Sequence, residues 1–253
     1  MHQRLANISD AESAWRRALT VCRQAANFEG EIDALEGLGR VARGHLPAAV
    51  ALRFYEDAIA RATVLEDRGR AARLHNSAGI IEWTRGQYES ALGHFERALT
   101  LFETLDDRVA AGQMMNSIGV SLDALGRAAD ARQHLQQALV HHERIGQPQL
   151  EAHALAGLGD SFWAAGDHRE AATWYERSLQ KRFETGDVRG EGWMLQRLAR
   201  AKTAVGDLDD GEGLLARATG IASRSSDEEL MDECTRLQHT MAHARAIPPL
   251  DRS

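Results

Sequence analysis

The sequence predicts an all-helical solenoid in which a pair of antiparallel helices repeats every forty residues. Two observations predict this fold: five columns of small or apolar residues recur with that period, and helix-capping residues recur beside them. The columns stay in phase without an insertion from residue 31 to residue 227. Such self-similarity is the signature of stacked repeats, in which each unit buries its apolar face against its neighbours.

The first column predicts a close crossing of the two helices within each repeat. Its members are Gly39, Gly79, Gly119, Gly159 and Ala199. A glycine inside a helix costs about 1 kcal/mol relative to alanine, so its recurrence needs a compensating gain. We expect the backbone of the second helix to approach there, at the column formed by Ala51, Ala91, Ala131, Ala171 and Gly211.

A second glycine column predicts the turn between the two helices. Gly86, Gly126, Gly166 and Gly206 fit the position just after a helix, where the left-handed conformation costs glycine little. The first repeat has Leu46 there, followed by Pro47, so we expect an irregular turn.

The remaining columns predict packing between repeats and helix starts. We expect Tyr55, Phe95, Leu135, Tyr175 and Leu215 to insert between neighbouring repeats, each followed by the small residue at Ala58, Ala98, Ala138, Ser178 or Ala218. Short oxygen-bearing side chains that precede a helix act as N-caps. Predicted caps are Asn27, Asp67, Asp107, Asp187 and Asp227, whereas Gln147 breaks the series.

These columns divide the chain into five repeats with different ends. The repeats span 28–67, 68–107, 108–147, 148–187 and 188–226. Their first helices are predicted at 28–44, 68–85, 108–125, 148–165 and 188–205, and their second helices at 48–66, 88–105, 128–145, 168–185 and 208–223. Residues 1–27 hold one helix in the phase of a second helix, either an N-terminal cap or the remnant of a longer protein. Residues 227–245 form a capping helix, and 246–253 a flexible tail.

Two segments resemble the tetratricopeptide repeat family. The segment 158–180 has Gly159, Gly166, Ala171 and Tyr175 at signature places, and 79–99 is similar although Glu82 replaces an aromatic residue. The period of forty is longer than the common 34 and is similar to that of bacterial signalling and transcription regulators. The resemblance implies a right-handed superhelix. The period alone would also allow HEAT repeats, but the glycine and alanine columns favour tetratricopeptide repeats.

The resemblance also implies a concave groove lined by the first helix of each repeat, at positions six and three before the first glycine column and one and four after it. The groove residues expected on this basis are Arg40, Arg43, Arg73, Asn76, Ile80, Trp83, Gln113, Asn116, Val120, Asp123, His153, Asp160, Trp163, Trp193, Gln196 and Arg200.

Three groups within this set suggest a peptide or protein ligand. The amides of Asn76 and Asn116 can pair with both the N–H and the C=O of an extended peptide, or they satisfy neighbouring helix termini, or they only face water. The series is interrupted at Ala156. Trp83, Trp163 and Trp193 are either binding anchors or packing between repeats. The cluster of Arg40, Arg43 and Arg73 suits carboxylates, unless it is a solvated face or is neutralised by the neighbouring Asp33 and Glu36.

Composition and motifs narrow the class of function. The net charge of −7 disfavours a nucleic-acid binder, and no apolar stretch is long enough for a signal peptide or a membrane span. The isolated thiols Cys22 and Cys234 fit a cytoplasmic protein. The common nucleophile, phosphate-loop and metalloprotease motifs do not occur, so we expect no catalytic residue, cofactor or metal. His239 and His243 share a helix face without a third metal ligand.

The sequence therefore predicts a peptide- or protein-binding scaffold that is not an enzyme. The alternative is the sensor segment of a multidomain bacterial transcription or signal-transduction protein. A third hypothesis is self-assembly into a homo-oligomer through the N-terminal edge.

Overall fold

A computed structural model describes the backbone of residues 2–246 and the side chains of residues 8–245, and within this part of the chain every regular element is a helix. The chain forms two compact units, residues 1–126 and 127–253. The first contains α1 (His2–Gln24), α2 (Phe28–His45), α3 (Ala48–Val64), α4 (Arg68–Thr84), α5 (Tyr88–Thr104) and α6 (Arg108–Ala124). The second contains α7 (Ala128–Ile145), α8 (Pro148–Ala164), α9 (His168–Thr185), α10 (Val188–Ala204), α11 (Leu208–Ser225) and α12 (Glu228–Ala246).

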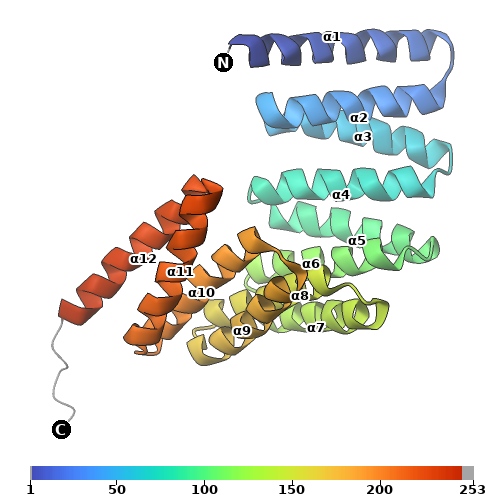
Figure 1. The fold of residues 1–253 in the computed structure, drawn as a ribbon. Helices are drawn as coiled ribbons and strands as arrows, with labels where there is room; N and C mark the ends of the chain where they lie inside the picture. The colour runs from blue at the N-terminus through green and yellow to red at the C-terminus, as the bar shows by residue number, and fades with distance from the viewer. Residues whose placement is uncertain (1, 247–253) are drawn as a thin grey trace. The chain divides into compact units, whose positions relative to one another are not determined.

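Within each unit, consecutive helices pack side by side and run in opposite directions (Figure 1). The predicted helix ranges of the five repeats agree with these bounds to within two residues. The division between the units falls in the turn between α6 and α7, inside the third predicted repeat.

The predicted turns are confirmed. Gly86, Gly126, Gly166 and Gly206 all have positive φ, between +74° and +89°. The turn after α2 is irregular as expected, because Leu46 is extended, with φ −119° and ψ 165°, and Pro47 then begins α3. The chain therefore reverses direction there without a left-handed residue.

The capping residues also behave as predicted. The side chains of Asn27, Asp67, Asp107 and Asp187 accept a hydrogen bond from the backbone N–H three residues later. Asp227 does the same for α12. Gln147 makes no such bond, and Pro148 occupies the first turn of α8 instead.

The first glycine column has a different role from the one expected. A Cβ atom added at Gly159 would lie 2.5 Å from the ring of Tyr175, and one added at Gly79 would lie 2.7 Å from the ring of Phe95. Gly39 faces Tyr55 in the same way. These glycines make room for an aromatic ring of the paired helix, not for its backbone. The aromatic column therefore packs inside its own hairpin as well as toward the next repeat.

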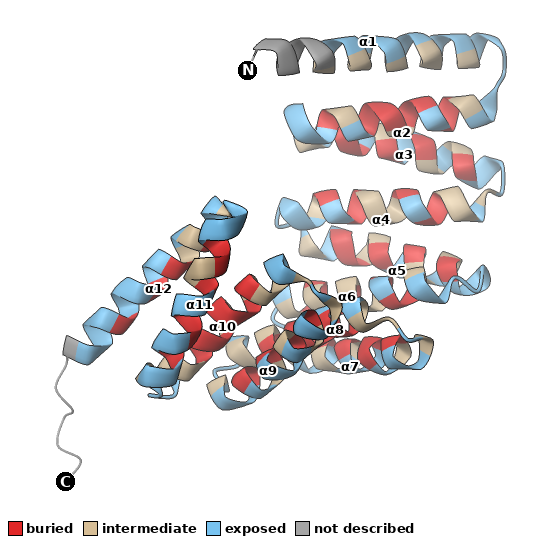
Figure 2. Cartoon of the chain, in the orientation of Figure 1, coloured by how far each residue is buried: buried red, intermediate tan, exposed pale blue. Residues whose placement is uncertain are grey.

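Each unit has its own core, formed by the inner faces of the paired helices (Figure 2). In the second unit, α12 packs against α10 and α11, and its buried residues Leu230, Cys234, Leu237 and Met241 join the core. Residues 247–253, most of the predicted flexible tail, lie outside the described residues.

The N-terminal helix α1 packs against α2. The indole of Trp15 packs against Gly37 of α2, where an added Cβ would lie 2.5 Å from the ring. Ala11, Trp15 and Ala18 remain half-buried, whereas the equivalent residues of α3 are buried.

Candidate functional site

In the first unit, α4, α5 and α6 enclose a cavity of about 220 Å³. Its lining residues are Ile80, Trp83, Phe95, Asn116, Ser117 and Val120. Four of these, Ile80, Trp83, Asn116 and Val120, are among the expected groove residues. Their convergence follows from the repeat, because α4 and α6 are the first helices of consecutive repeats and present the same columns to the same side.

The cavity is apolar and partly open to solvent. Ile80 and Trp83 keep 41% and 39% of their surface exposed, an uncommon fraction for side chains of this size. The indole of Trp83 contacts the ring of Tyr88, with the two centroids 6.0 Å apart. A rigid aromatic wall of this kind can bury an apolar side chain of a ligand.

The two asparagines predicted to bind a peptide backbone have no structural partner. Neither Asn76 nor Asn116 hydrogen bonds through its side chain to another described residue, and Oδ1 of Asn116 is buried without a donor. The alternative assignment, in which the amides satisfy neighbouring helix termini, therefore finds no support in this structure. A buried amide oxygen without a donor costs free energy that an added N–H would recover.

The arginine cluster at the N-terminal end of the groove is only weakly neutralised. Arg40 lies 4.0 Å from Glu36, whereas Arg43 and Arg73 form no ion pair with any described residue. Asp33, expected to neutralise the cluster, instead binds Arg70 at 3.1 Å. Exposed guanidinium groups remain available to an anionic ligand.

In the second unit, the corresponding helix faces carry charged groups. The guanidinium of Arg200 (α10) lies over the indole of Trp163 (α8), with its Cζ atom 4.1 Å from the ring centroid. The imidazole of His168 contacts the same indole at 4.3 Å between centroids. Asp160 accepts hydrogen bonds from Tyr175, at 2.8 Å, and from Arg197.

Burial, together with the charge of Asp160 and its hydrogen bond, raises the pKa of the Tyr175 hydroxyl. The hydroxyl therefore stays protonated and serves as a fixed donor. Asp160 thus has two partners within the protein, although its side chain keeps 40% of its surface exposed.

The other predicted residues differ in exposure. Gln113 and His153 are exposed on α6 and α8, and Asp123 is half-buried near the end of α6. Gln196 is 4% exposed, so its amide is not accessible to a ligand. Trp193 is partly buried and packs against the core of the second unit. For Trp193, packing between repeats is therefore the correct interpretation.

Sequence reasoning missed Phe95, Ser117 and the pair formed by Arg197 and Tyr175. Phe95 was assigned only to packing, although its ring also forms part of the cavity wall. An additional column, two residues before the first glycine column, would have included Ser117 and Arg197.

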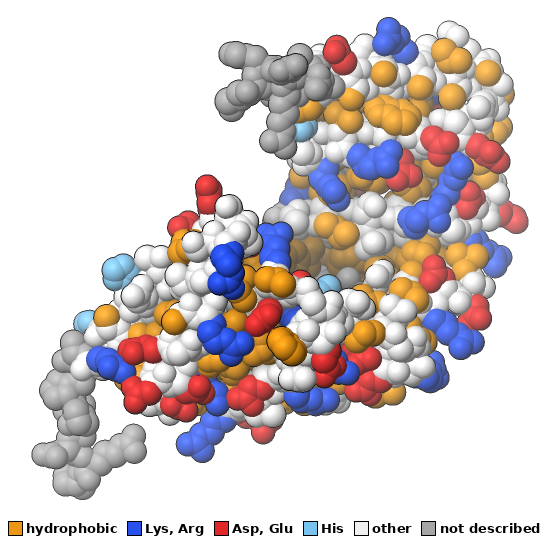
Figure 3. All heavy atoms as spheres, in the orientation of Figure 1, with side chains coloured by type: hydrophobic (Ala, Val, Ile, Leu, Met, Phe, Trp, Pro, Cys, Tyr) orange, Lys and Arg blue, Asp and Glu red, His pale blue; other side chains and the backbone are white. Residues whose placement is uncertain are grey.

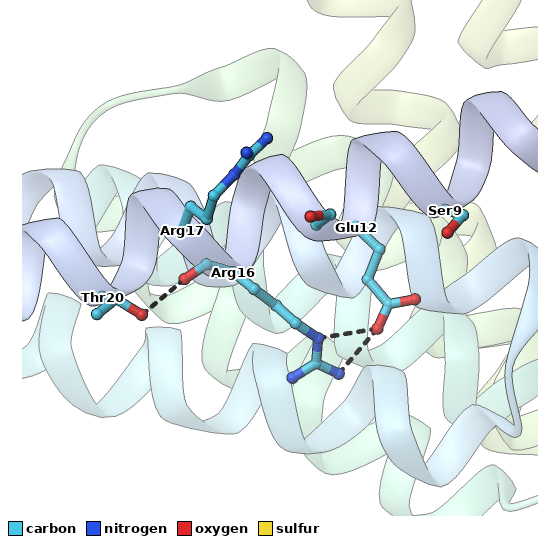
Figure 4. A pocket seen from close by; sticks show the side chains of 6 residues that line it. Ser9, Glu12, Arg16, Arg17 and Thr20 are labelled. Carbon is cyan, nitrogen blue, oxygen red and sulfur yellow. Dashed lines mark hydrogen bonds and ion pairs between the residues drawn. The ribbon is translucent and has the colours of Figure 1, made fainter.

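A second cavity, of about 410 Å³, lies over the outer face of α1 and is lined by polar side chains of that helix. Arg16 pairs with Glu12 at 2.8 Å, while Arg17 extends away from the pair (Figure 4). Charged residues of both signs are also interspersed over the visible face of each unit (Figure 3). No helix in the described part of the chain has the length and apolar character needed to cross a membrane.

Comparison with solved structures supports the fold. The BtubC protein from P. vanneervenii is 18% identical, with a TM-score of 0.74 over 87% of this chain and 92% of that one. The Rap conjugation gene regulator of plasmid pLS20, solved with the Phr* peptide, is 17% identical, with a TM-score of 0.72. That alignment covers 87% of this chain and 60% of the regulator.

A third similar structure is a signal-transduction ATPase from Pyrococcus horikoshii that has a tetratricopeptide repeat sensor. It is 14% identical, with a TM-score of 0.75, and the alignment covers 92% of this chain but 36% of the ATPase. No curated protein matches the sequence. The tetratricopeptide repeat profile matches residues 47–104 and 107–182, more than half of the sequence. With the paired helices and glycine turns described above, this match places the chain in the tetratricopeptide repeat family.

Proposed function

We propose that this protein is a binding scaffold that holds an extended peptide, or an exposed segment of a partner protein, on the first helices of its repeats. The observation that carries the proposal is the cavity between α4 and α6, where the exposed apolar surface of Ile80 and Trp83 adjoins an amide without a protein partner. An apolar side chain of the ligand enters the cavity, and a backbone N–H of the ligand donates a hydrogen bond to Asn116.

The spacing of the two amides supports a ligand in extended conformation. Asn76 and Asn116 occupy the same position in consecutive repeats, so they can contact separate peptide groups along one extended strand. Recognition of the backbone supplies affinity that depends little on sequence, whereas the apolar cavity adds selectivity. The pLS20 regulator, a structural neighbour, was solved with a peptide bound.

The proposal is tested by capturing partners from the native cell and mapping the retained peptides. Replacing Asn76 and Asn116 together with alanine should abolish capture while the melting temperature stays within about 2 °C. The matched control is Gln137→Ala, which removes an exposed amide from α7. A double variant that unfolds would show that the amides are structural, and undiminished capture would refute the proposal.

A second candidate is a sensor segment within a larger bacterial regulator, located in the cytoplasm. The tetratricopeptide repeat sensor of the archaeal ATPase has a similar fold, and this chain spans about a third of that protein. In that case the same groove would bind the signal. A DNA-binding or ATPase domain encoded in frame with this chain would favour the sensor over the scaffold.

A further inference from the structure

In the second unit, Arg200 is a cation that forms no hydrogen bond or ion pair with any described residue. Its guanidinium lies over the indole of Trp163. Its Nε atom is shielded from solvent and has no acceptor. This one N–H group therefore lacks the hydrogen bond that it would make in water.

Asp160 on α8 does not form an ion pair with this charge. Its two oxygens accept hydrogen bonds from the hydroxyl of Tyr175 and from Arg197. Asp160 and Arg197 cancel each other, so the cluster retains one positive charge, located on Arg200.

The indole of Trp163 holds that charge in place. A guanidinium stacked on an aromatic face is restricted to one plane, which leaves the N–H groups at its edge directed outward. His168, on the opposite element α9, contacts the same indole and restricts its rotation. A planar cation fixed in this way is suited to two parallel hydrogen bonds from a carboxylate.

We infer that Trp163 and Arg200 form a binding site for a carboxylate, supplied by an aspartate or glutamate side chain of the bound peptide. This inference rests on the proposed function and specifies the chemistry of its ligand. The carboxylate supplies the missing counterion and accepts hydrogen bonds from the outward-directed N–H groups of Arg200.

The test titrates the protein with the blocked pentapeptide Ac-Ala-Ala-Glu-Ala-Ala-NH2 and with its glutamine counterpart. Binding is followed by the NMR resonances of the Trp163 indole N–H and the Arg200 Nε–H, assigned with the variants Trp163→Phe and Arg200→Met. Both resonances should shift saturably with the glutamate peptide and hardly at all with the glutamine peptide. Raising the salt concentration should weaken the response.

The chain offers a matched control, because Arg177 is also stacked on an indole, that of Trp174, at 4.5 Å. Arg200→Met should lower the affinity for the glutamate peptide about tenfold, whereas Arg177→Met should leave it unchanged. Equal shifts with both peptides, or equal losses in both variants, would overturn the inference. If capture of a partner depends on Asn116 but not on Arg200, the proposed function would stand and the carboxylate site would be refuted.

Discussion

The two units of this protein use the same repeat columns to build different surfaces. One and four residues after the glycine column, the first unit has Ile80 and Trp83 on α4, with Val120 on α6, around an apolar cavity. The second unit has Asp160 and Trp163 on α8 and Arg200 on α10, which form a charged and aromatic cluster. The repeat therefore determines where a side chain lies, whereas the residue types vary freely at positions outside the core.

The columns inside the hairpins show the opposite behaviour. Gly39, Gly79 and Gly159 each face an aromatic ring of the paired helix, in both units. A protein core is closely packed, so a side chain of a different volume does not fit at such a contact. Variation in residue type is therefore confined to the surface columns. Four predictions test this distinction between surface columns and hairpin columns.

The largest effect is expected inside a hairpin. Replacing Gly159 with leucine places a side chain where a Cβ alone already lies 2.5 Å from the ring of Tyr175, so the free energy of unfolding should fall by about 3 kcal/mol or more. Urea denaturation measures the change. The control is Gly93→Ala on α5, where nothing lies within 4 Å and stability should rise by about 0.5–1 kcal/mol. Similar values for both variants would contradict the assignment of the column.

A surface column should affect binding more than stability. Trp83→Ala removes the exposed wall of the cavity and should weaken partner binding by about 2 kcal/mol. Because the side chain is 39% exposed, stability should change by only about 1 kcal/mol. Isothermal titration with a captured partner peptide, beside thermal unfolding, separates the two effects. A loss of stability larger than the loss of binding would place Trp83 in the core.

A third prediction concerns an exception to the apolar hairpin columns. His75 on α4 and His94 on α5 lie with their Nδ1 atoms 3.0 Å apart, where the first repeat has Leu35 and Phe54. Burial, helped by His94 and Arg97, lowers the pKa of His75 to about 4. Burial and Arg97 also lower the pKa of His94, against the opposing effect of Glu82 and Glu56.

A histidine whose folded pKa is lowered binds fewer protons in the folded than in the unfolded state. The stability contributed by the neutral pair is therefore complete above pH 6.5 and is lost as the pH falls toward 4. Unfolding curves from pH 7 to 4.5 should show a decline that flattens in the double variant His75→Leu, His94→Phe. Equal slopes in both proteins would show that other groups cause the acid sensitivity.

The smallest effect is expected at the missing cap. Gln147→Asp should supply α8 with the side-chain acceptor that Asp67, Asp107 and Asp187 give their helices, and raise stability by about 0.5–1 kcal/mol. The control is Gln149→Asp, which places a carboxylate on the second residue of α8 instead of the residue before the helix. A gain from both variants would indicate a charge effect at the helix N-terminus instead of a cap.

The sequence by itself determined the helices, their turns and their caps. These features depend on local backbone chemistry: glycine tolerates positive φ at Gly86, and a carboxylate such as Asp67 accepts the N–H groups that begin a helix. They repeat every forty residues, so each copy supports the assignment of the others.

Only the tertiary structure decided which surface residues cooperate. Asn116, Trp83 and Phe95 come from three helices, and their shared cavity depends on how those helices pack. Likewise, Asp160 and Gln196 belong to the predicted groove columns, yet one is bound by Tyr175 and Arg197 and the other is buried. Periodicity specifies the direction of a side chain from its own helix, whereas its accessibility depends on side chains that are distant in sequence.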